Sequence, residues 1–141
     1  MKDINRFAGV IIKYGDDVLL GKRSIHKSLP GEWSIPAGHL HEGEHPMDAC
    51  RRECYEETNI KINGKLKLVG FINRHNREGK KNKGLMYVFL YESDKKLNPN
   101  LNSAKDGDEH SEFKYFNLNN LPFSDKSDQL SQIITRILKK Y

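Results

Sequence analysis

Hydrophobic and polar positions alternate through the first third of the chain in a way that predicts strands. Residues 7–14 are rich in β-forming side chains, residues 15–17 are typical of a turn, and a return strand begins at residues 18–20. Residues 26–38 contain two prolines and two glycines, which indicates a structured loop, and a short strand is expected within it at residues 33–35.

The pattern changes at residue 46. Residues 46–58 predict a helix, because proline stands in the first turn and neither glycine nor proline interrupts the interior. Residues 61–73 predict one or two strands, and residues 74–84 form a basic loop. The nearly continuous apolar run at residues 85–91 predicts a strand that is buried on both faces.

The last third is expected to hold a polar, asparagine-rich loop over residues 94–107, a strand over 112–118 and an amphipathic helix over 127–140. The order strand-strand-helix-strand-strand-helix favours a mixed sheet with helices on its faces, in an α/β or α+β layered fold. The chain has 141 residues, so one domain over residues 1–141 is expected.

Charge and cysteine content bear on the kind of partner and on the cellular compartment. There are 24 Lys and Arg residues against 19 Asp and Glu, a net charge of +5, which suits a phosphate-bearing partner but does not identify one. The two cysteines do not make a disulfide framework. The apolar runs at the start of the chain are too short for a signal peptide or a membrane span, so we expect a cytoplasmic protein with no membrane partner.

The segment GHLHEGEHPMDACRRECYEETNI, residues 38–60, contains the densest potential metal ligands. At 100° per residue, Cys50 and Cys54 share a narrow helical stripe with Met47, which is typical of core packing. Zinc sites favour a second, distant cluster of ligands, and the other histidines stand alone in the sequence. A local zinc site of both cysteines and one histidine nevertheless stays open, because the thiols are one turn apart.

Three acids lie on the neighbouring stripe: Glu53, Glu56 and Glu57 are spaced i, i+3 and i+4 and repel one another. Glu44 adds a fourth acid before the helix, and only Arg51 and Arg52 are near enough in sequence to offset the charge. Clustered carboxylates suit a hard cation such as Mg²⁺. A solvated helix face is the alternative that spacing alone leaves open.

The same residues resemble a known family. Gly38, Glu44, Arg52-Glu53, Glu56-Glu57 and Ile60 follow the Nudix box, G-x5-E-x7-R-E-U-x-E-E-x-G-U, where U is bulky and apolar. Asn59 replaces the second glycine, at a position expected to be the left-handed helix cap, where asparagine is the next best residue. Cys54 is small for its apolar position. The resemblance extends over residues 5–140 and implies the family's α/β/α sandwich around a mixed sheet.

The resemblance implies an enzyme that cleaves a nucleoside diphosphate linked to another moiety, with divalent cations. It implies that Mg²⁺ or Mn²⁺ is held by Glu53, Glu56 and Glu57, joined by the carbonyl of Ala37. Glu44 and Arg52 would support the site. The general base would be Glu53 or a later acid, of which Glu112 is the best match and Glu109 and Asp108 are rivals; Glu112 could instead be a further metal ligand.

Residues outside the helix are implied to bind substrate. Arg23 and Gly38 would lie near the phosphates or ribose, and Trp33 and Phe71 would flank a base, although a strand-edge cation and core aromatics are the alternatives. The basic loop over residues 74–84 would steer polyphosphates or be a solvated hairpin tip.

The substrate expected from the resemblance is a (deoxy)nucleoside triphosphate, as in MutT-like members, cleaved to monophosphate and pyrophosphate. Nucleotide sugars and RNA 5′ ends stay open as substrates, and nucleic acid is otherwise not expected as a partner. A non-catalytic nucleotide-sensing or RNA-binding module is the alternative of another class. A homodimer is a further possibility that the family allows, and the sequence assigns no role to His39, His41 or His45.

Overall fold

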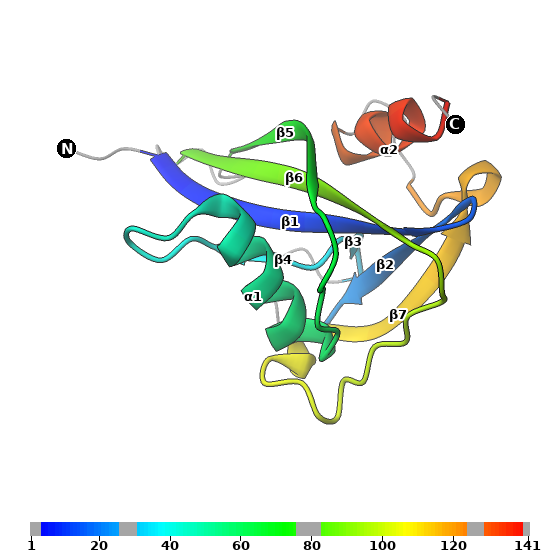
Figure 1. Cartoon of the computed structure of the whole chain (residues 1–141), viewed down its shortest axis with the longest axis horizontal. Helices are drawn as coiled ribbons and strands as arrows, with labels where there is room; N and C mark the ends of the chain where they lie inside the picture. The colour runs from blue at the N-terminus through cyan, green and yellow to red at the C-terminus, as the bar shows by residue number, and fades with distance from the viewer. Residues whose placement is uncertain (1–3, 26–30, 76–82, 124–128, 140–141) are drawn as a thin grey trace.

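A computed structural model of the chain describes residues 4–25, 31–75, 83–123 and 129–139. These residues form seven strands, two α-helices and two short 3-10 helices (Figure 1). In chain order the elements are β1 (Ile4–Tyr14), β2 (Asp17–Arg23), β3 (Trp33–Ser34), β4 (Ala37–His39), α1 (Pro46–Thr58), β5 (Lys67–His75), β6 (Lys83–Ser93), η1 (Gly107–Glu109), β7 (His110–Asn117), η2 (Leu118–Asn120) and α2 (Gln129–Lys139).

The strands form one mixed sheet in the order β3-β2-β1-β6-β5, with β4 paired to β1 and β7 paired to β2. The parallel pair β1–β6 runs the full length of both strands. Antiparallel pairing places β4 beside the first half of β1, whereas β2 pairs with the end of β1. β4 therefore pairs with a part of β1 that β2 does not, and it lies next to α1.

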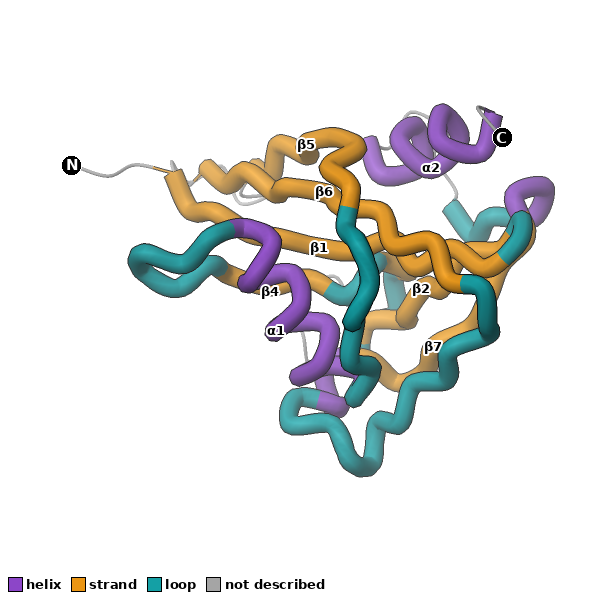
Figure 2. Tube along the Cα trace, in the orientation of Figure 1, coloured by secondary structure: helices purple, strands orange, loops and turns teal. Residues whose placement is uncertain are grey.

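The two faces of the sheet carry separate cores because side chains alternate along β1. Ala8, Val10 and Ile12 pack on one face with the buried side of α1. Phe7 and Ile11 point to the other face, where they join the apolar side of α2. Figure 2 shows both helices against the sheet and the long loop that joins β6 to β7. The mixed α+β sandwich expected from the sequence is confirmed.

The helix expected over residues 46–58 is confirmed as Pro46–Thr58. Asn59 takes the left-handed conformation expected of it, with φ 65° and ψ 13°, and its N–H donates to the carbonyl of Tyr55 at 2.8 Å. The C-terminal helix is described from Gln129 to Lys139, within its expected range.

Other boundaries differ from expectation. Residues 61–73 hold one strand, which starts only at Lys67. The segment before it is irregular: Ile62 and Leu66 are buried there, and Arg51 donates hydrogen bonds to two of its carbonyls. β4 was not expected, since three residues carry too little periodicity to signal a strand. β7 begins two residues earlier than expected, at His110.

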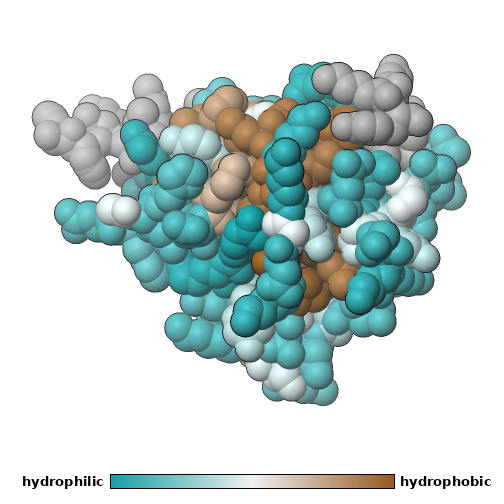
Figure 3. Space-filling view, in the orientation of Figure 1, coloured by the Kyte–Doolittle hydropathy of each residue, from teal (hydrophilic) through white to brown (hydrophobic). Residues whose placement is uncertain are grey.

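Apolar side chains also reach the surface beside α1. Figure 3 shows hydrophobic residues gathered over β5 and β6, where Leu68 is 44% and Phe71 is 50% exposed. The Phe71 ring meets that of Tyr87 edge-on, with centroids 5.5 Å apart. Within the described residues, no helix is long and apolar enough to cross a membrane.

Candidate functional site

Helix α1 presents its acidic stripe to strand β4. The ring Nδ1 of His45 accepts a hydrogen bond from the N–H of Met47 at 3.1 Å and caps the start of the helix. Pairing of Gly38 with Ala8 fixes β4 against β1, directly beside the helix. Gly38 has no side chain, and a Cβ there would lie 2.1 Å from the carboxyl carbon of Glu53. The glycine therefore makes room for the Glu53 carboxylate.

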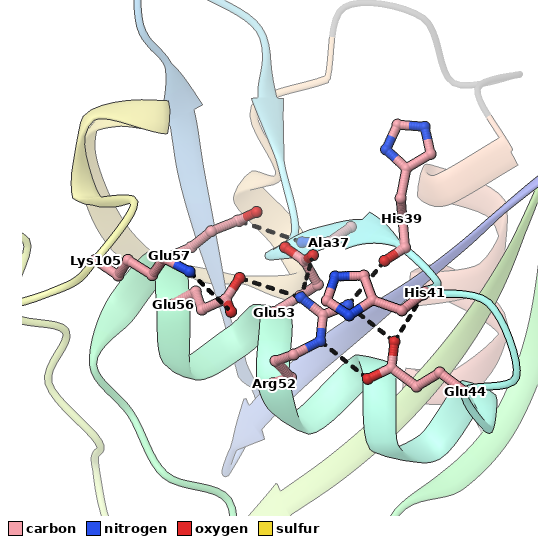
Figure 4. A network of polar contacts seen from close by, with 9 residues as sticks. All are labelled: Ala37, His39, His41, Glu44, Arg52, Glu53, Glu56, Glu57 and Lys105. Carbon is pink, nitrogen blue, oxygen red and sulfur yellow. Dashed lines mark hydrogen bonds and ion pairs between the residues drawn. The ribbon is translucent and has the colours of Figure 1, made fainter.

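Arg52 connects most of the polar groups at this position (Figure 4). Its Nε and Nη2 donate to the two carboxylate oxygens of Glu44 at 2.9 and 3.0 Å. Nη1 donates to Glu53 at 2.8 Å and to Glu56 at 3.1 Å. Nη2 also donates to the carbonyl of His39 at 2.9 Å. One guanidinium thus ties three carboxylates and the end of β4 together.

The Arg52 guanidinium holds the pKa of Glu44 far below its ordinary value, at about 2, so Glu44 is ionised at neutral pH. Glu44 also accepts from the N–H of His41 at 2.9 Å. Figure 4 shows the His39 ring pointing away from the network while its carbonyl faces Arg52. Of these three histidines, His45 therefore caps the helix with its ring, whereas His39 and His41 contribute backbone groups to the network.

Only Arg52 of the two neighbouring arginines serves the acids. Arg51 points to the other side of α1 and donates to the carbonyls of Ile62 at 3.0 Å and Gly64 at 2.9 Å. Arg51, which the sequence places near enough to offset the acidic charge, therefore faces away from the acids. The reason is the helical step of 100°, which turns adjacent side chains onto different faces.

Glu57 differs from the other acids because it is buried. The residue is 4% exposed, and its Oε1 accepts from the N–H of Ala37 at 3.3 Å. Burial, followed by the nearby charge of Glu53, raises the pKa of Glu57 to about 9. Burial likewise raises the pKa of Glu53, despite the opposing effect of Arg52. At Glu57, burial and the neighbouring carboxylates outweigh the nearby charge of Arg23, whereas Arg52 pairs directly with Glu53 and Glu56.

The loop before β7 closes the far end of the helix. The N–H of Asp106 donates to the carbonyl of Glu56, and the N–H of Asn100 donates to that of Thr58 at 2.8 Å. The hydroxyl of Ser24 donates to the carbonyl of Asp108 at 2.6 Å and joins this loop to the end of β2. These contacts satisfy carbonyls of the last helical turn and bring residues 106–110 beside the acids.

Two residues of that loop lie close to Glu57. Glu109 is near enough for its charge to raise the pKa of Glu57, and it also pairs with Arg23 at 3.5 Å. Nδ1 of His110 lies 3.9 Å from Oε1 of Glu57, and burial lowers the pKa of His110 to about 4. Sequence reasoning named Glu109 only as a rival acid and missed His110, since a single histidine before a strand carries no signal.

Three of the residues expected at the site lie elsewhere in the described structure. Glu112 pairs with Lys22 across β7 and β2, and strand alternation puts it on the face of Phe116, opposite α1. Trp33 lies on that same face, edge-on to Phe116 with centroids 4.9 Å apart. Phe71 is three strands from Gly38 in the same row, roughly 14 Å away at the usual strand spacing.

Among the residues described, the hydrogen bonds and ion pairs of these acids do not include Glu112, Trp33 or Phe71. Arg23, in contrast, reaches Glu109 and thereby the neighbourhood of Glu57. The basic loop expected to steer polyphosphates falls mainly on residues 76–82, which lie outside the described residues.

The two cysteines belong to the core. Both are buried among the apolar side chains that pack α1 against the sheet, and the Cys50 thiol donates to the carbonyl of Gly9 at 3.6 Å. Burial raises the pKa of the Cys54 thiol to about 12 and that of Cys50 higher still. Protonated, core-packed thiols are poor zinc ligands, so the arrangement favours the packing interpretation over the zinc site.

The donor chemistry fits a hard divalent cation, because α1 carries three carboxylates on the side that faces β4, and burial together with the charge of Glu53 raises the pKa of Glu57. As the side chains lie, no group of three His, Cys, Asp or Glu residues in the described ranges is close enough together to hold a metal ion. Arg52 instead binds one oxygen each of Glu53 and Glu56.

Comparisons with known proteins indicate one protein family for this chain. The family model of the NUDIX domain matches residues 4–137. A relative described as an RNA pyrophosphohydrolase, from Bartonella bacilliformis, is 30% identical over 132 residues, covering 80% of this chain and 76% of the relative. An 8-oxo-dGTP diphosphatase from Proteus vulgaris is 33% identical over 61 residues, covering 43% of this chain and 54% of its own length.

A similar fold has been solved in a MutT NUDIX hydrolase from Burkholderia pseudomallei. The two structures agree with a TM-score of 0.77 over 96% of this chain and 98% of the other, at 21% sequence identity.

Proposed function

Because this chain belongs to the NUDIX family and is a hydrolase of phosphorus-containing anhydrides, we propose a specific reaction for it. It cleaves the pyrophosphate linkage of a (deoxy)nucleoside triphosphate, with Mg²⁺ or Mn²⁺, and the products are the monophosphate and pyrophosphate. The observation that carries the proposal is the pair of helical carboxylates, Glu53 and Glu56, that Arg52 holds beside the end of β4, with Glu57 next to them on the same helix. Glu57 is buried close to Glu53 and Glu109, so a cation bound there would offset carboxylate charge that Arg23 offsets only in part.

Glu53, Glu56 and Glu57 would hold the cation, with the carbonyl of Ala37 as a further donor. Such a cation neutralises the diphosphate charge and lowers the pKa of a bound water toward neutrality. Arg52 fixes the rotamers of Glu53 and Glu56 before substrate arrives, so the carboxylates do not have to be ordered during the reaction. Glu44 in turn holds Arg52 by two hydrogen bonds and keeps the guanidinium oriented.

The general base is proposed among the acids around Glu57. Glu53 has a raised pKa, which suits a group that must accept a proton from water near neutral pH. For the later acid, proximity to Glu57 supports Glu109, whereas the role predicted for Glu112 stays a prediction. Comparing Glu109→Gln with Glu112→Gln shows which of the two acids takes part in the reaction, because replacing that acid lowers kcat more.

An RNA 5′ end is a second candidate substrate, and one observation favours it. The relative that covers 80% of this chain is described as an RNA pyrophosphohydrolase. The net charge of +5 would also favour a polyanion over a single nucleotide. Both candidates present a 5′-triphosphate to the same acids, so the proposed chemistry is shared and only the attached group differs.

The test is a panel of (deoxy)nucleoside triphosphates, nucleotide sugars and a 5′-triphosphorylated RNA oligonucleotide, with Mg²⁺ or Mn²⁺ at mildly alkaline pH. Released phosphate and pyrophosphate are measured for the wild type, Glu57→Gln and the exposed control Glu42→Gln. We expect turnover that needs the cation, loss of at least a hundredfold in Glu57→Gln with the fold intact, and wild-type rates in Glu42→Gln. Turnover of nothing in the panel would reject the enzyme and favour the non-catalytic module.

A further inference from the structure

The side chain of His110 is placed in an unusual way for a histidine. It is 2% exposed, and within the described part of the chain neither ring nitrogen has a hydrogen-bond partner. Buried polar groups in native proteins almost always find such a partner, because burial removes the water that would otherwise bind them. A histidine that served only to fill space would be replaced at lower cost by an apolar residue of similar volume.

The ring is held at a particular place. Its Cδ2 edge lies over Gly21, where a Cβ would come within 2.8 Å of that atom, so the position tolerates no larger residue at 21. The ring of Phe113 packs against it with centroids 4.8 Å apart. Nδ1 is thereby directed at Glu57, with 3.9 Å between Nδ1 and Oε1.

The same carboxylate oxygen accepts a hydrogen bond from another strand. The N–H of Ala37 reaches Oε1 of Glu57 from β4 at 3.3 Å, whereas His110 approaches from the start of β7. Ala37 and His110 both lie on strands rather than on α1, which carries Glu57 itself. A carboxylate held by donors from two different strands has its orientation fixed relative to the sheet and not only to its own helix.

We propose that His110 is a positioning residue for Glu57. In the working enzyme, a shift of about 1 Å closes the Nδ1–Oε1 gap to a hydrogen bond. This bond, together with the one from the Ala37 N–H, fixes the Glu57 carboxylate toward the bound cation and diphosphate. The inference rests on the proposed function, since it assigns a role toward the same site. No proton is transferred by His110; the ring donates a hydrogen bond and nothing else.

Two substitutions separate positioning from packing. His110→Asn keeps an N–H donor close to the place of Nδ1 but leaves a small void, whereas His110→Leu fills the space and removes the donor. If the ring only packs, leucine should be the better replacement. If the ring positions Glu57, asparagine should be the better one. Thermal unfolding of both variants shows how much each affects the fold.

The readouts are kcat and KM with the best substrate of the panel, and the Kd for Mn²⁺ of the nucleotide-free protein by electron paramagnetic resonance. We expect His110→Leu to lower kcat and weaken Mn²⁺ binding by about 10- to 100-fold, with little change in KM and no loss of Tm. His110→Asn should stay within about threefold of wild type in both, as expected for a retained donor.

Wild-type kcat and Mn²⁺ affinity in His110→Leu would overturn the inference, as would losses in the two variants that simply follow their Tm. The Mn²⁺ measurement also separates this inference from the proposed function. If the wild type binds Mn²⁺ but hydrolyses nothing in the panel, the proposed reaction fails, while the order of the two variants in Mn²⁺ affinity still decides the role of His110.

Discussion

Glu44 and Arg52 are joined by two parallel hydrogen bonds, with Nε 2.9 Å from Oε2 and Nη2 3.0 Å from Oε1. Glu44 lies before α1 and Arg52 lies in its second turn, so this pair anchors the entry loop to the helix. The same guanidinium then reaches Glu53 and Glu56. Through the guanidinium, the pair thus orients two of the acids proposed to bind the cation.

Replacing Arg52 by lysine should remove most of the hydrogen bonds that orient these acids. Lysine keeps the charge but cannot make the two-point contact with Glu44 while also binding two further carboxylates. We expect kcat to fall by about 10- to 100-fold and the free energy of unfolding to fall by about 1–2 kcal/mol. Arg51→Lys is the matched control: it loosens the carbonyls of Ile62 and Gly64 and should lower stability while leaving kcat unchanged. Equal loss of kcat in both variants would contradict the assignment.

Gly38→Ala should displace the Glu53 carboxylate. The added Cβ would lie 2.1 Å from the carboxyl carbon and from Oε1, and the flexible glutamate can move away without disturbing the backbone. We therefore expect a change in unfolding free energy below about 1 kcal/mol but a loss of kcat above tenfold.

Gly64→Ala provides the comparison for this variant, because its Cβ would crowd Tyr91 at 2.6 Å, on a loop that takes no part in the acid cluster. That variant should lose stability and keep kcat. Stability from denaturant titration and kcat from the nucleotide assay, measured for both variants, should show opposite patterns; parallel losses in the two would refute the placement of Glu53.

Stability of the cation-free protein should depend on pH through Glu57. Its pKa of about 9 lies above the ordinary 4.5, so the folded state holds a proton that the unfolded chain releases. This contribution is complete below pH 4.5 and is lost as pH rises toward 9. The pKa of His110, lowered from 6.5 to about 4, acts in the opposite sense, with stability present above pH 6.5 and lost toward pH 4.

Between pH 6.5 and 9 only Glu57 of this pair titrates in the folded protein. The free energy of unfolding should therefore fall with rising pH by up to about 1.4 kcal/mol per pH unit. Denaturant titrations in EDTA at three pH values in this range measure the slope. Glu57→Gln should reduce it, leaving what Glu53 and, near pH 9, the two buried cysteines contribute. A slope that the variant leaves unchanged would show that Glu57 is ionised throughout.

Asn59 ends α1 in the left-handed conformation, at φ 65°. Alanine there should lower the free energy of unfolding by about 1 kcal/mol, because a Cβ is strained at positive φ and lacks the local hydrogen bonding of asparagine. Glycine should be at least as stable as asparagine, since it has no such strain. Thermal unfolding of the two variants gives the comparison. Alanine as stable as glycine would contradict the left-handed cap.

Proline in the first turn and an interior without glycine or proline were enough to predict α1, and the second glycine position of the Nudix box predicted its left-handed cap at Asn59. The helical step separates Cys50 and Cys54 on the core stripe from the acids on the next, and both placements depend only on the geometry of a single helix. The family pattern then linked those acids to pyrophosphate chemistry. Arg52 could be named for the same reason, since it lies one turn before Glu56 on the same helix.

The sequence by itself therefore determined the helix, its polar and apolar stripes, and the class of reaction that such acids support. Only the tertiary structure decided that Glu57 is buried, that β4 donates to it from Ala37, and that Glu109 and His110 come beside it rather than Glu112. These features depend on contacts between segments up to 53 residues apart in the chain, such as Glu57 and His110. Strand register and loop closure bring such segments together, and neither leaves a periodic trace in the sequence.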